Sequence, residues 1–390
     1  MITKSGSLRG SSQIDHFLIA IVLLLTGLGL VTLYSSSYAF AQKRFLGDGL
    51  FLISHQALLC LGGIVLFFIS SFIDLGLLRK FIKPLVFGSI LLCVLTFVPG
   101  IGINKNGAAR WIGIGSFSYQ PSELVKLVLP LYLAHFFEKK GDNIDSISKG
   151  IIPPAIISGG MVFLIYKQNN FSTAVFLALN ALLLFFLAGV KFRYLFSALL
   201  MFLPTATLLV LEKEHRVRRF LSFIQPDFEP QGSRYQVNSS ILSISSGGFW
   251  GKGLGQGARR ISNVPEVHSD FIFSSFAEES GFLGVMLFSL LFAVFAIRAY
   301  SSSMKNENTF NRLLGCGLVT MIVSQALLNI AVAAGALPPT GVPLPFFSAG
   351  GSSLVTTLVM AGLIVNVSRF SKNRPSETVY PNAALAGEKR

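Results

Sequence analysis

The sequence FLIAIVLLLTGLGLVTL, residues 17–33, decides the fold class. It carries no charge and, extended to residue 37, is long enough to cross a bilayer as a helix, which takes about 20 apolar residues. Lys4 and Arg9 before it and AFA at 39–41 after it imitate a cleaved signal peptide. The apolar run is longer than the core of such a signal and further apolar runs follow it, which favours a retained membrane anchor.

Nine further apolar runs follow along the chain, near residues 50–72, 83–99, 121–137, 150–166, 171–190, 194–212, 270–297, 313–335 and 347–368. The sequence therefore predicts about ten spans, with nine or eleven left open because some runs lie close together. The chain is 52% hydrophobic and 13% charged, against roughly 25% charged residues in soluble domains. This composition excludes disordered, collagenous and disulfide-scaffold classes and disfavours a soluble enzyme. The three cysteines, each inside an apolar run, have neither the number nor the spacing of a disulfide framework or a zinc site.

The basic residues, which give a formal net charge of +14, are unequally divided between the two sides. With the N-terminus inside, eighteen Lys and Arg lie on the cytoplasmic side and five in the short loops opposite. An excess of Lys and Arg marks cytoplasmic loops, so both termini are expected in the cytoplasm. We expect an all-α integral membrane protein with a cytoplasmic segment 1–16, a membrane domain 17–368 containing one large extracytoplasmic loop at about 213–269, and a cytoplasmic tail 369–390.

The large extracytoplasmic loop holds eight of the basic residues. It begins with EKEHRVRR, residues 212–219, where a span leaves the membrane. Arginine binds phosphate oxygens bidentately, so this cluster is either a phosphate clamp or a group of side chains that snorkel to lipid head groups. Lys252 lies in SGGFWGKGLGQG, residues 246–257, where glycines let the backbone approach a ligand closely, although the P-loop pattern is absent.

The loop ends in VPEVHSD, residues 264–270, directly before an apolar helix. Ser269 or Asp270 would make an ordinary helix N-cap. Three ionisable groups within five residues, at the point where a polar loop meets a membrane helix, indicate a second possibility. A carboxylate there could accept a proton from a bound hydroxyl group.

Charged and polar side chains inside the predicted spans are expensive to bury and mark pathways, sites or helix contacts. Glu123 and Lys126 are three residues apart and share a helix face. They form either an intrahelical ion pair in the bundle interior or a pair that faces a substrate cavity. Gln325 and Asn329 are typical of hydrogen bonding between helices. The segment ALPPTGVPLPF, residues 336–346, cannot form a regular helix and must be buried in protein or line a cavity.

These motifs, taken in order, resemble the SEDS family (shape, elongation, division and sporulation), typified by FtsW and RodA. The resemblance covers residues 15–370 and rests on six pieces: GAARWI at 107–112, QPSELVK at 120–126, RVRR at 216–219, GGFWGKG at 247–253, PEVHSDFIF at 265–273, and the proline-rich segment followed by GGSS at 350–353. The loop from residue 215 to residue 256 resembles the division type more closely, whereas LPF at 344–346 leans toward the elongation type.

The resemblance implies an inverting glycosyltransferase in the bacterial cytoplasmic membrane that polymerises lipid II into peptidoglycan strands. It implies as partners a class B penicillin-binding transpeptidase and other divisome or elongasome proteins, and no nucleic acid. An assisting divalent cation is left open. In these terms we expect Asp270 to be the general base and substrate to be bound by Arg110, Trp111, Glu123, Lys126, Arg216, Arg219, Lys252 and His268.

Two departures from the family pattern bear on the site. Residues 168–170 read Gln-Asn-Asn where the family usually has Gln-Pro-Asp, and Ala349 stands where a tyrosine is usual. Two other classes of function stay open: a transporter that moves lipid II across the membrane, and a scaffold that only positions the transpeptidase.

Overall fold

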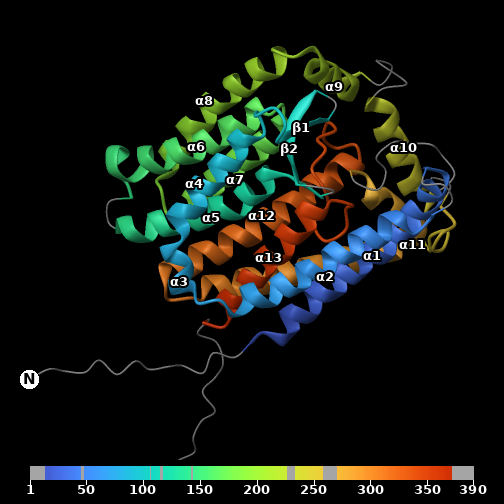
Figure 1. Cartoon of the computed structure of the whole chain (residues 1–390), viewed down its shortest axis with the longest axis horizontal. Helices are drawn as coiled ribbons and strands as arrows, with labels where there is room; N and C mark the ends of the chain where they lie inside the picture. The colour runs from blue at the N-terminus through green and yellow to red at the C-terminus, as the bar shows by residue number, and fades with distance from the viewer. Residues whose placement is uncertain are drawn as a thin grey trace, which may run out of the picture.

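The computed structural model describes residues 14–44, 48–105, 107–114, 117–141, 144–225, 233–257 and 270–370. Within these ranges every predicted span coincides with a helix (Figure 1). The ten helices are α1 (His16–Arg44), α2 (Phe51–Phe72), α4 (Ile82–Leu95), α5 (Pro121–Lys140), α6 (Ile152–Lys167), α7 (Phe171–Leu187), α8 (Phe192–Leu211), α11 (Ile272–Met304), α12 (Thr309–Ala333) and α13 (Gly351–Ser368). The shorter helices are α3 (Leu75–Lys80), η2 (Ile147–Ile151), α9 (Glu214–Ile224) and α10 (Ser233–Ser246).

Seven helices in the described ranges are long and apolar enough to cross a membrane, the one that includes α6 extending back through η2. Helices α4 and α7 are apolar but shorter. Helix α5 is the exception in composition, because it carries Glu123 and Lys126 in its first half and Glu138 near its end. It lies among α4, α7, α12 and α13. Protein rather than lipid therefore surrounds its polar groups, and the expected all-α membrane fold is confirmed.

Helix α8 lies at the opposite extreme of burial. None of its residues is buried, and it contacts only α7 and the neighbouring α9 closely. Figure 1 shows it at the edge of the bundle. An apolar helix with this exposure is stable where lipid covers its surface.

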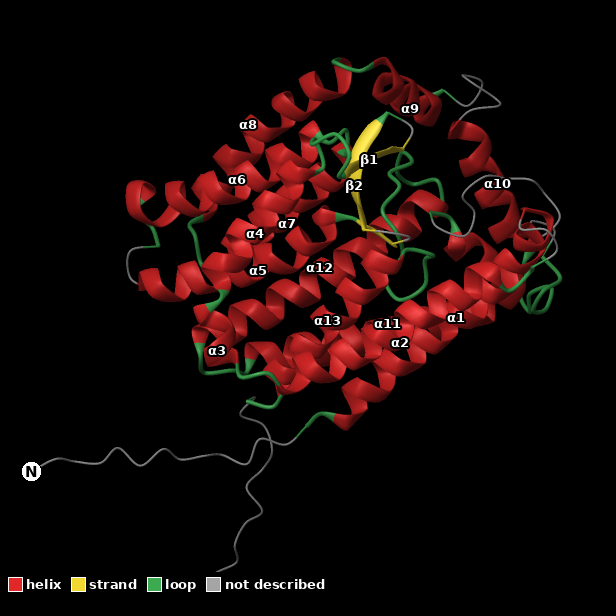
Figure 2. Ribbon diagram, viewed as in Figure 1, coloured by secondary structure: helices red, strands yellow, loops and turns green. Residues whose placement is uncertain are grey.

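A small antiparallel sheet lies between α4 and α5, in a stretch that the sequence analysis treats only as a short loop (Figure 2). Its strands are β1 (Gly102–Lys105), β2 (Ala108–Ile114) and β3 (Phe117–Tyr119), in that order. Ile103 pairs with Trp111, and Ile112 pairs with Tyr119. The sheet fixes the strand that carries Arg110 and Trp111.

The glycine-rich segment packs against a break in α11 at Gly281, whose φ is +64°. The amide of Phe282 donates to the carbonyl of Gly248 at 2.9 Å, and the amide of Gly253 donates to the carbonyl of Glu279 at 3.1 Å. A Cβ atom on Gly281 would lie 2.2 Å from the backbone nitrogen of Gly251. Glycine is needed here for both the backbone angle and the close approach of the two segments.

Candidate active site

Asp270 lies two residues before Ile272, the first residue of α11. Its backbone carbonyl accepts a hydrogen bond from Asn329 Nδ2 at 2.9 Å. Its carboxylate faces the proline-rich segment, because a Cβ atom built on Gly341 would lie 3.4 Å from Asp270 Oδ2. Phe271, and not Asp270, is the N-cap residue of α11, and Ser269, the other expected N-cap, lies outside the described residues.

Asp270 lines a cavity of about 1890 Å³. The cavity is bounded by β2, the α6–α7 turn, α9, the proline-rich segment and the faces of α7 and α12. Val175, Leu179 and Leu183 line it from one face of α7, at intervals of four residues. From Phe171 to Leu183 the helix rises by about 18 Å, at 1.5 Å per residue. The cavity thus has a polar end at the start of α7 and an apolar wall that runs into the bundle.

Basic side chains gather at the polar end of this cavity. Arg216 and Arg219 come from α9, with Lys213 and His215 beside them, and Arg110 comes from β2. Trp111 also lines the cavity. The structure therefore brings together five of the nine residues expected at the site: Asp270, Arg110, Trp111, Arg216 and Arg219.

Both Arg110 and Arg216 are held by the turn between α6 and α7. The guanidinium carbon of Arg216 lies 5.0 Å from the ring centroids of both Tyr166 and Phe171, and its NH1 donates to the carbonyl of Leu209 at 2.7 Å. Arg110 NH2 donates to the carbonyl of Asn169. Of the two α9 arginines that line the cavity, Arg216 is buried and Arg219 is exposed.

His215 lies near the positive charges at this end of the cavity. Partial burial, together with the charges of Arg216, Arg219, Lys213 and Arg110, lowers the pKa of its imidazole. The lowered pKa favours the neutral form of the imidazole. An anionic ligand would counteract both the charges and the shift, so protonation of His215 is coupled to anion binding.

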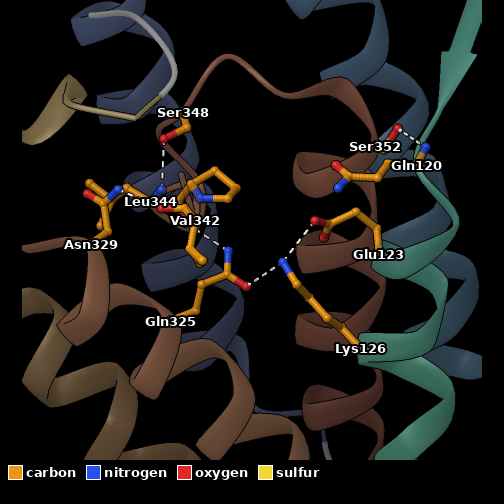
Figure 3. Close-up of polar contacts among 10 residues, drawn as sticks. Gln120, Glu123, Lys126, Gln325, Asn329, Val342, Leu344, Ser348 and Ser352 are labelled. Atoms are coloured by element: carbon orange, nitrogen blue, oxygen red, sulfur yellow. Dashed lines mark hydrogen bonds and ion pairs between the residues drawn. The ribbon is translucent and has the colours of Figure 1, made fainter. Parts of the chain in front are cut away.

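Glu123 and Lys126 are not in the cavity wall, where we expected them. Lys126 Nζ donates to Glu123 Oε1 at 2.8 Å and to Gln325 Oε1 at 3.0 Å, and the side chains of the ion pair are only 1% and 4% exposed (Figure 3). Phe176, which does line the cavity, has its ring centroid 5.8 Å from Lys126 Nζ. These contacts fit the interpretation as a buried ion pair, in which the two opposite charges compensate each other away from solvent.

Lys252 also lies away from the cavity lining. Its Nζ is 2.7 Å from Glu278 Oε1, and its backbone amide donates to the carbonyl of the same residue at 3.0 Å. The contacts show a side chain that neutralises a buried carboxylate and secures the glycine-rich segment on α11. His268, the remaining expected substrate contact, lies outside the described residues.

The α6–α7 turn lines the cavity, although none of the expected site residues lies in it. Asn169 adopts a φ of +60° and its Nδ2 donates to the carbonyl of Gly107 at 2.9 Å, which joins the turn to the sheet. Asn170 lines the cavity, and its buried Nδ2 has no partner among the residues that the structure describes. In the sequence, this turn is marked only by the difference from the family pattern at residues 168–170. That difference does not show that the turn contacts both Arg110 and Arg216.

Comparisons with known proteins give the same family as the sequence motifs. The chain is 36% identical to the "Probable peptidoglycan glycosyltransferase FtsW" of Geobacter sp. strain M18 over 354 residues, 91% of this chain and 96% of the relative. It is 35% identical to the stage V sporulation protein E of Bacillus subtilis, over 92% of this chain and 98% of that protein.

Similar solved structures support the same family assignment. One chain of a peptidoglycan synthase complex, described as coordinating polymerization and crosslinking, superposes with a TM-score of 0.76 at 30% identity, covering 93% of this chain and 99% of the other. The rod shape determining protein RodA of Thermus thermophilus gives a TM-score of 0.67 at 28% identity, covering 93% and 98%. The model of the cell cycle protein family of FtsW, RodA and SpoVE matches residues 15–373. The chain therefore belongs to the FtsW, RodA and SpoVE family of membrane-embedded proteins.

Proposed function

We propose that the chain is a peptidoglycan glycosyltransferase that polymerises lipid II, and that Asp270 is its general base. The observation that carries the proposal is the single cavity shared by the Asp270 carboxylate and the guanidinium groups of Arg110, Arg216 and Arg219. A carboxylate accepts a proton from an attacking hydroxyl, and arginines stabilise a departing diphosphate. One cavity thus holds groups for both parts of a glycosyl transfer from a lipid diphosphate, namely removal of the proton from the acceptor hydroxyl and stabilisation of the departing diphosphate.

The cavity suits an amphiphilic substrate. Its polar end has cationic side chains for a diphosphate and Trp111 for the face of a sugar ring. Its apolar wall of Val175, Leu179 and Leu183 is complementary to a polyprenyl chain. The exposed apolar surface of α8 beside α7 is consistent with entry of such a chain from the lipid phase.

The reaction follows from this placement. The 4-hydroxyl of the acceptor sugar attacks the anomeric carbon of the donor, and its proton passes to a carboxylate oxygen of Asp270. A glycosidic bond forms as the bond from the anomeric carbon to the diphosphate oxygen breaks, with inversion at that carbon. Arg219 and Arg216 are placed to neutralise the charge that develops on the diphosphate, and His215 gains a proton as that charge approaches.

Partner and topology belong to the same proposal. We infer that a class B penicillin-binding transpeptidase crosslinks the strands that this chain makes, which the similarity to a chain of a peptidoglycan synthase complex supports. The excess of Lys and Arg on one side supports cytoplasmic placement of both termini. The cavity with Asp270 then opens on the extracytoplasmic side.

The direct experiment is polymerisation of purified fluorescent lipid II by the reconstituted protein, with and without its transpeptidase, resolved on gels. General-base removal typically costs 10²–10⁴-fold in rate, so Asp270→Asn abolishes visible product at unchanged expression. A transporter would move lipid II and leave it monomeric, with or without the substitution. A scaffold would tolerate Asp270→Asn, and near-normal polymerisation by that variant refutes the assigned base.

A further inference from the structure

One amide side chain in the core joins Asp270 to the wall of the cavity. Asn329, on α12, donates from Nδ2 to the carbonyl of Asp270 at 2.9 Å and to the carbonyl of Val342 at 2.8 Å. The side chain is buried, with the residue only 1% exposed. Because both partners are acceptors, the nitrogen must face them, and an Asp carboxylate could not replace it.

Gln325, one turn away on the same helix face, continues this contact. Its Nε2 donates to the carbonyl of Pro343 at 2.8 Å, and its Oε1 accepts from Lys126 (Figure 3). Two successive carbonyls of the proline-rich segment are therefore held by α12. Prolines have no N–H group, so the segment has few backbone donors of its own, and the amide side chains of α12 donate to these two carbonyls.

The anchored segment lies against the reacting group. Gly341 directly precedes Val342, and it is at Gly341 that an added Cβ atom would lie 3.4 Å from Asp270 Oδ2. One amide nitrogen thus ties down the backbone of Asp270 and, at the same time, the backbone next to its carboxylate. We therefore expect a change at Asn329 to shift the backbone that carries the carboxylate, while the residues that line the cavity stay unsubstituted because Asn329 is not among them.

We propose that Asn329 is a positioning residue for glycosyl transfer, which holds the Asp270 carboxylate against the proline-rich wall in reach of the acceptor hydroxyl. The inference rests on the proposed function of Asp270. A general base must lie about 2.6–3.2 Å from the oxygen that it deprotonates. A displacement of about 1 Å at a reacting centre lowers the rate by as much as 10²-fold.

The chain offers a matched control in Asn366 on α13. Its Nδ2 also donates to two backbone carbonyls, those of Ser70 at 2.9 Å and Ile73 at 2.7 Å, and it is equally buried. None of these three residues lines the cavity. Asn366→Asp therefore removes the same pair of donated bonds elsewhere in the bundle and measures the general effect of losing such a contact.

The test compares Asn329→Asp, Asn329→Ser and Asn366→Asp in the reconstituted lipid II polymerisation assay, with thermal unfolding in detergent measured in parallel. We expect Asn329→Asp to lower kcat about 10–100-fold with KM for lipid II within about threefold of the unsubstituted protein. Asn329→Ser, whose hydroxyl can restore one bond, should give an intermediate kcat and keeps the test valid if Asn329→Asp does not fold. Asn366→Asp should lower the unfolding temperature and leave kcat within about twofold.

The positioning role is overturned if the Asn329 variants lose no more kcat than Asn366→Asp, or if their loss lies in KM alone. Asp270→Asn, measured beside them, separates this result from failure of the proposed function. An inactive Asp270→Asn together with Asn329 variants of normal kcat refutes only the positioning role. An active Asp270→Asn refutes the base itself.

Discussion

The buried pair of Glu123 and Lys126 gives the sharpest test of how this site is built. Its side chains are 4% and 1% exposed, and the nitrogen and oxygen are 2.8 Å apart. Removing one partner of such a pair leaves an uncompensated buried charge, which typically destabilises by about 3–5 kcal/mol, whereas replacing both by apolar residues is often neutral or stabilising. Lys126→Met should therefore lower the free energy of unfolding by about 3 kcal/mol or more. The double variant Glu123→Leu, Lys126→Met should recover most of that loss.

The measurement is thermal unfolding of the three proteins in detergent, followed by lipid II polymerisation at a temperature where all are folded. If the pair serves only to hold α5, α12 and the proline-rich segment together, activity follows stability and the double variant polymerises within about threefold of the unsubstituted protein, after allowance for the lost bond to Gln325. A double variant that is stable and inactive would refute this reasoning. It would show instead that these charges contact substrate, as first expected from the sequence.

Three further predictions follow from single contacts. Gly341→Ala puts an L side chain at a φ of +71°, which costs about 1–2 kcal/mol, and brings its methyl group into van der Waals contact with Asp270 Oδ2 at 3.4 Å. A backbone shift that relieves this strain should lower kcat about tenfold with little change in binding of lipid II, as steady-state kinetics will show. Partial burial and neighbouring cations lower the pKa of His215 below its ordinary value, so the imidazole gains its proton only at a pH below the usual range. KM for the diphosphate substrate should therefore fall as the pH is lowered from about 7.5 to about 5. His215→Gln should abolish that pH effect on KM, and an unchanged profile contradicts the assignment. Gly281→Ala forces a Cβ atom to within 2.2 Å of Gly251 N at a φ of +64°, and thermal unfolding should show a loss of at least about 1–2 kcal/mol from the backbone angle alone.

The expected site residues that lie together in the structure are those marked by a local chemical signal. Asp270 stands out because it is a carboxylate at the junction of a polar loop and an apolar helix, and Arg216 and Arg219 stand out because they cluster where a span ends. The structure brings these residues into one cavity with Arg110 and Trp111. Their chemistry remains a proposal, and its test is the polymerisation assay.

Expected site residues lie apart from the cavity where their position depends on which element covers a face. The spacing of Glu123 and Lys126 shows only that they share a side of α5, and Gln325 from a distant part of the chain decides that this side is sealed. Lys252 carries a positive charge suited to binding phosphate, but in the structure its ammonium group pairs with the carboxylate of Glu278 on α11. The small sheet was missed because its strands are only three to seven residues long.

The sequence by itself determined that this is a helical membrane protein, and approximately which residues form each of its ten main helices. The reason is that membrane insertion depends on local hydrophobicity, which one continuous run of residues supplies. Only the tertiary structure decided which polar groups meet: that Asn329 holds both Asp270 and Val342, and that the α6–α7 turn supports Arg110 and Arg216. Hydrogen bonds and ion pairs act over a few ångströms, so they depend on contacts between segments that lie far apart in the chain and leave no periodic signal within it.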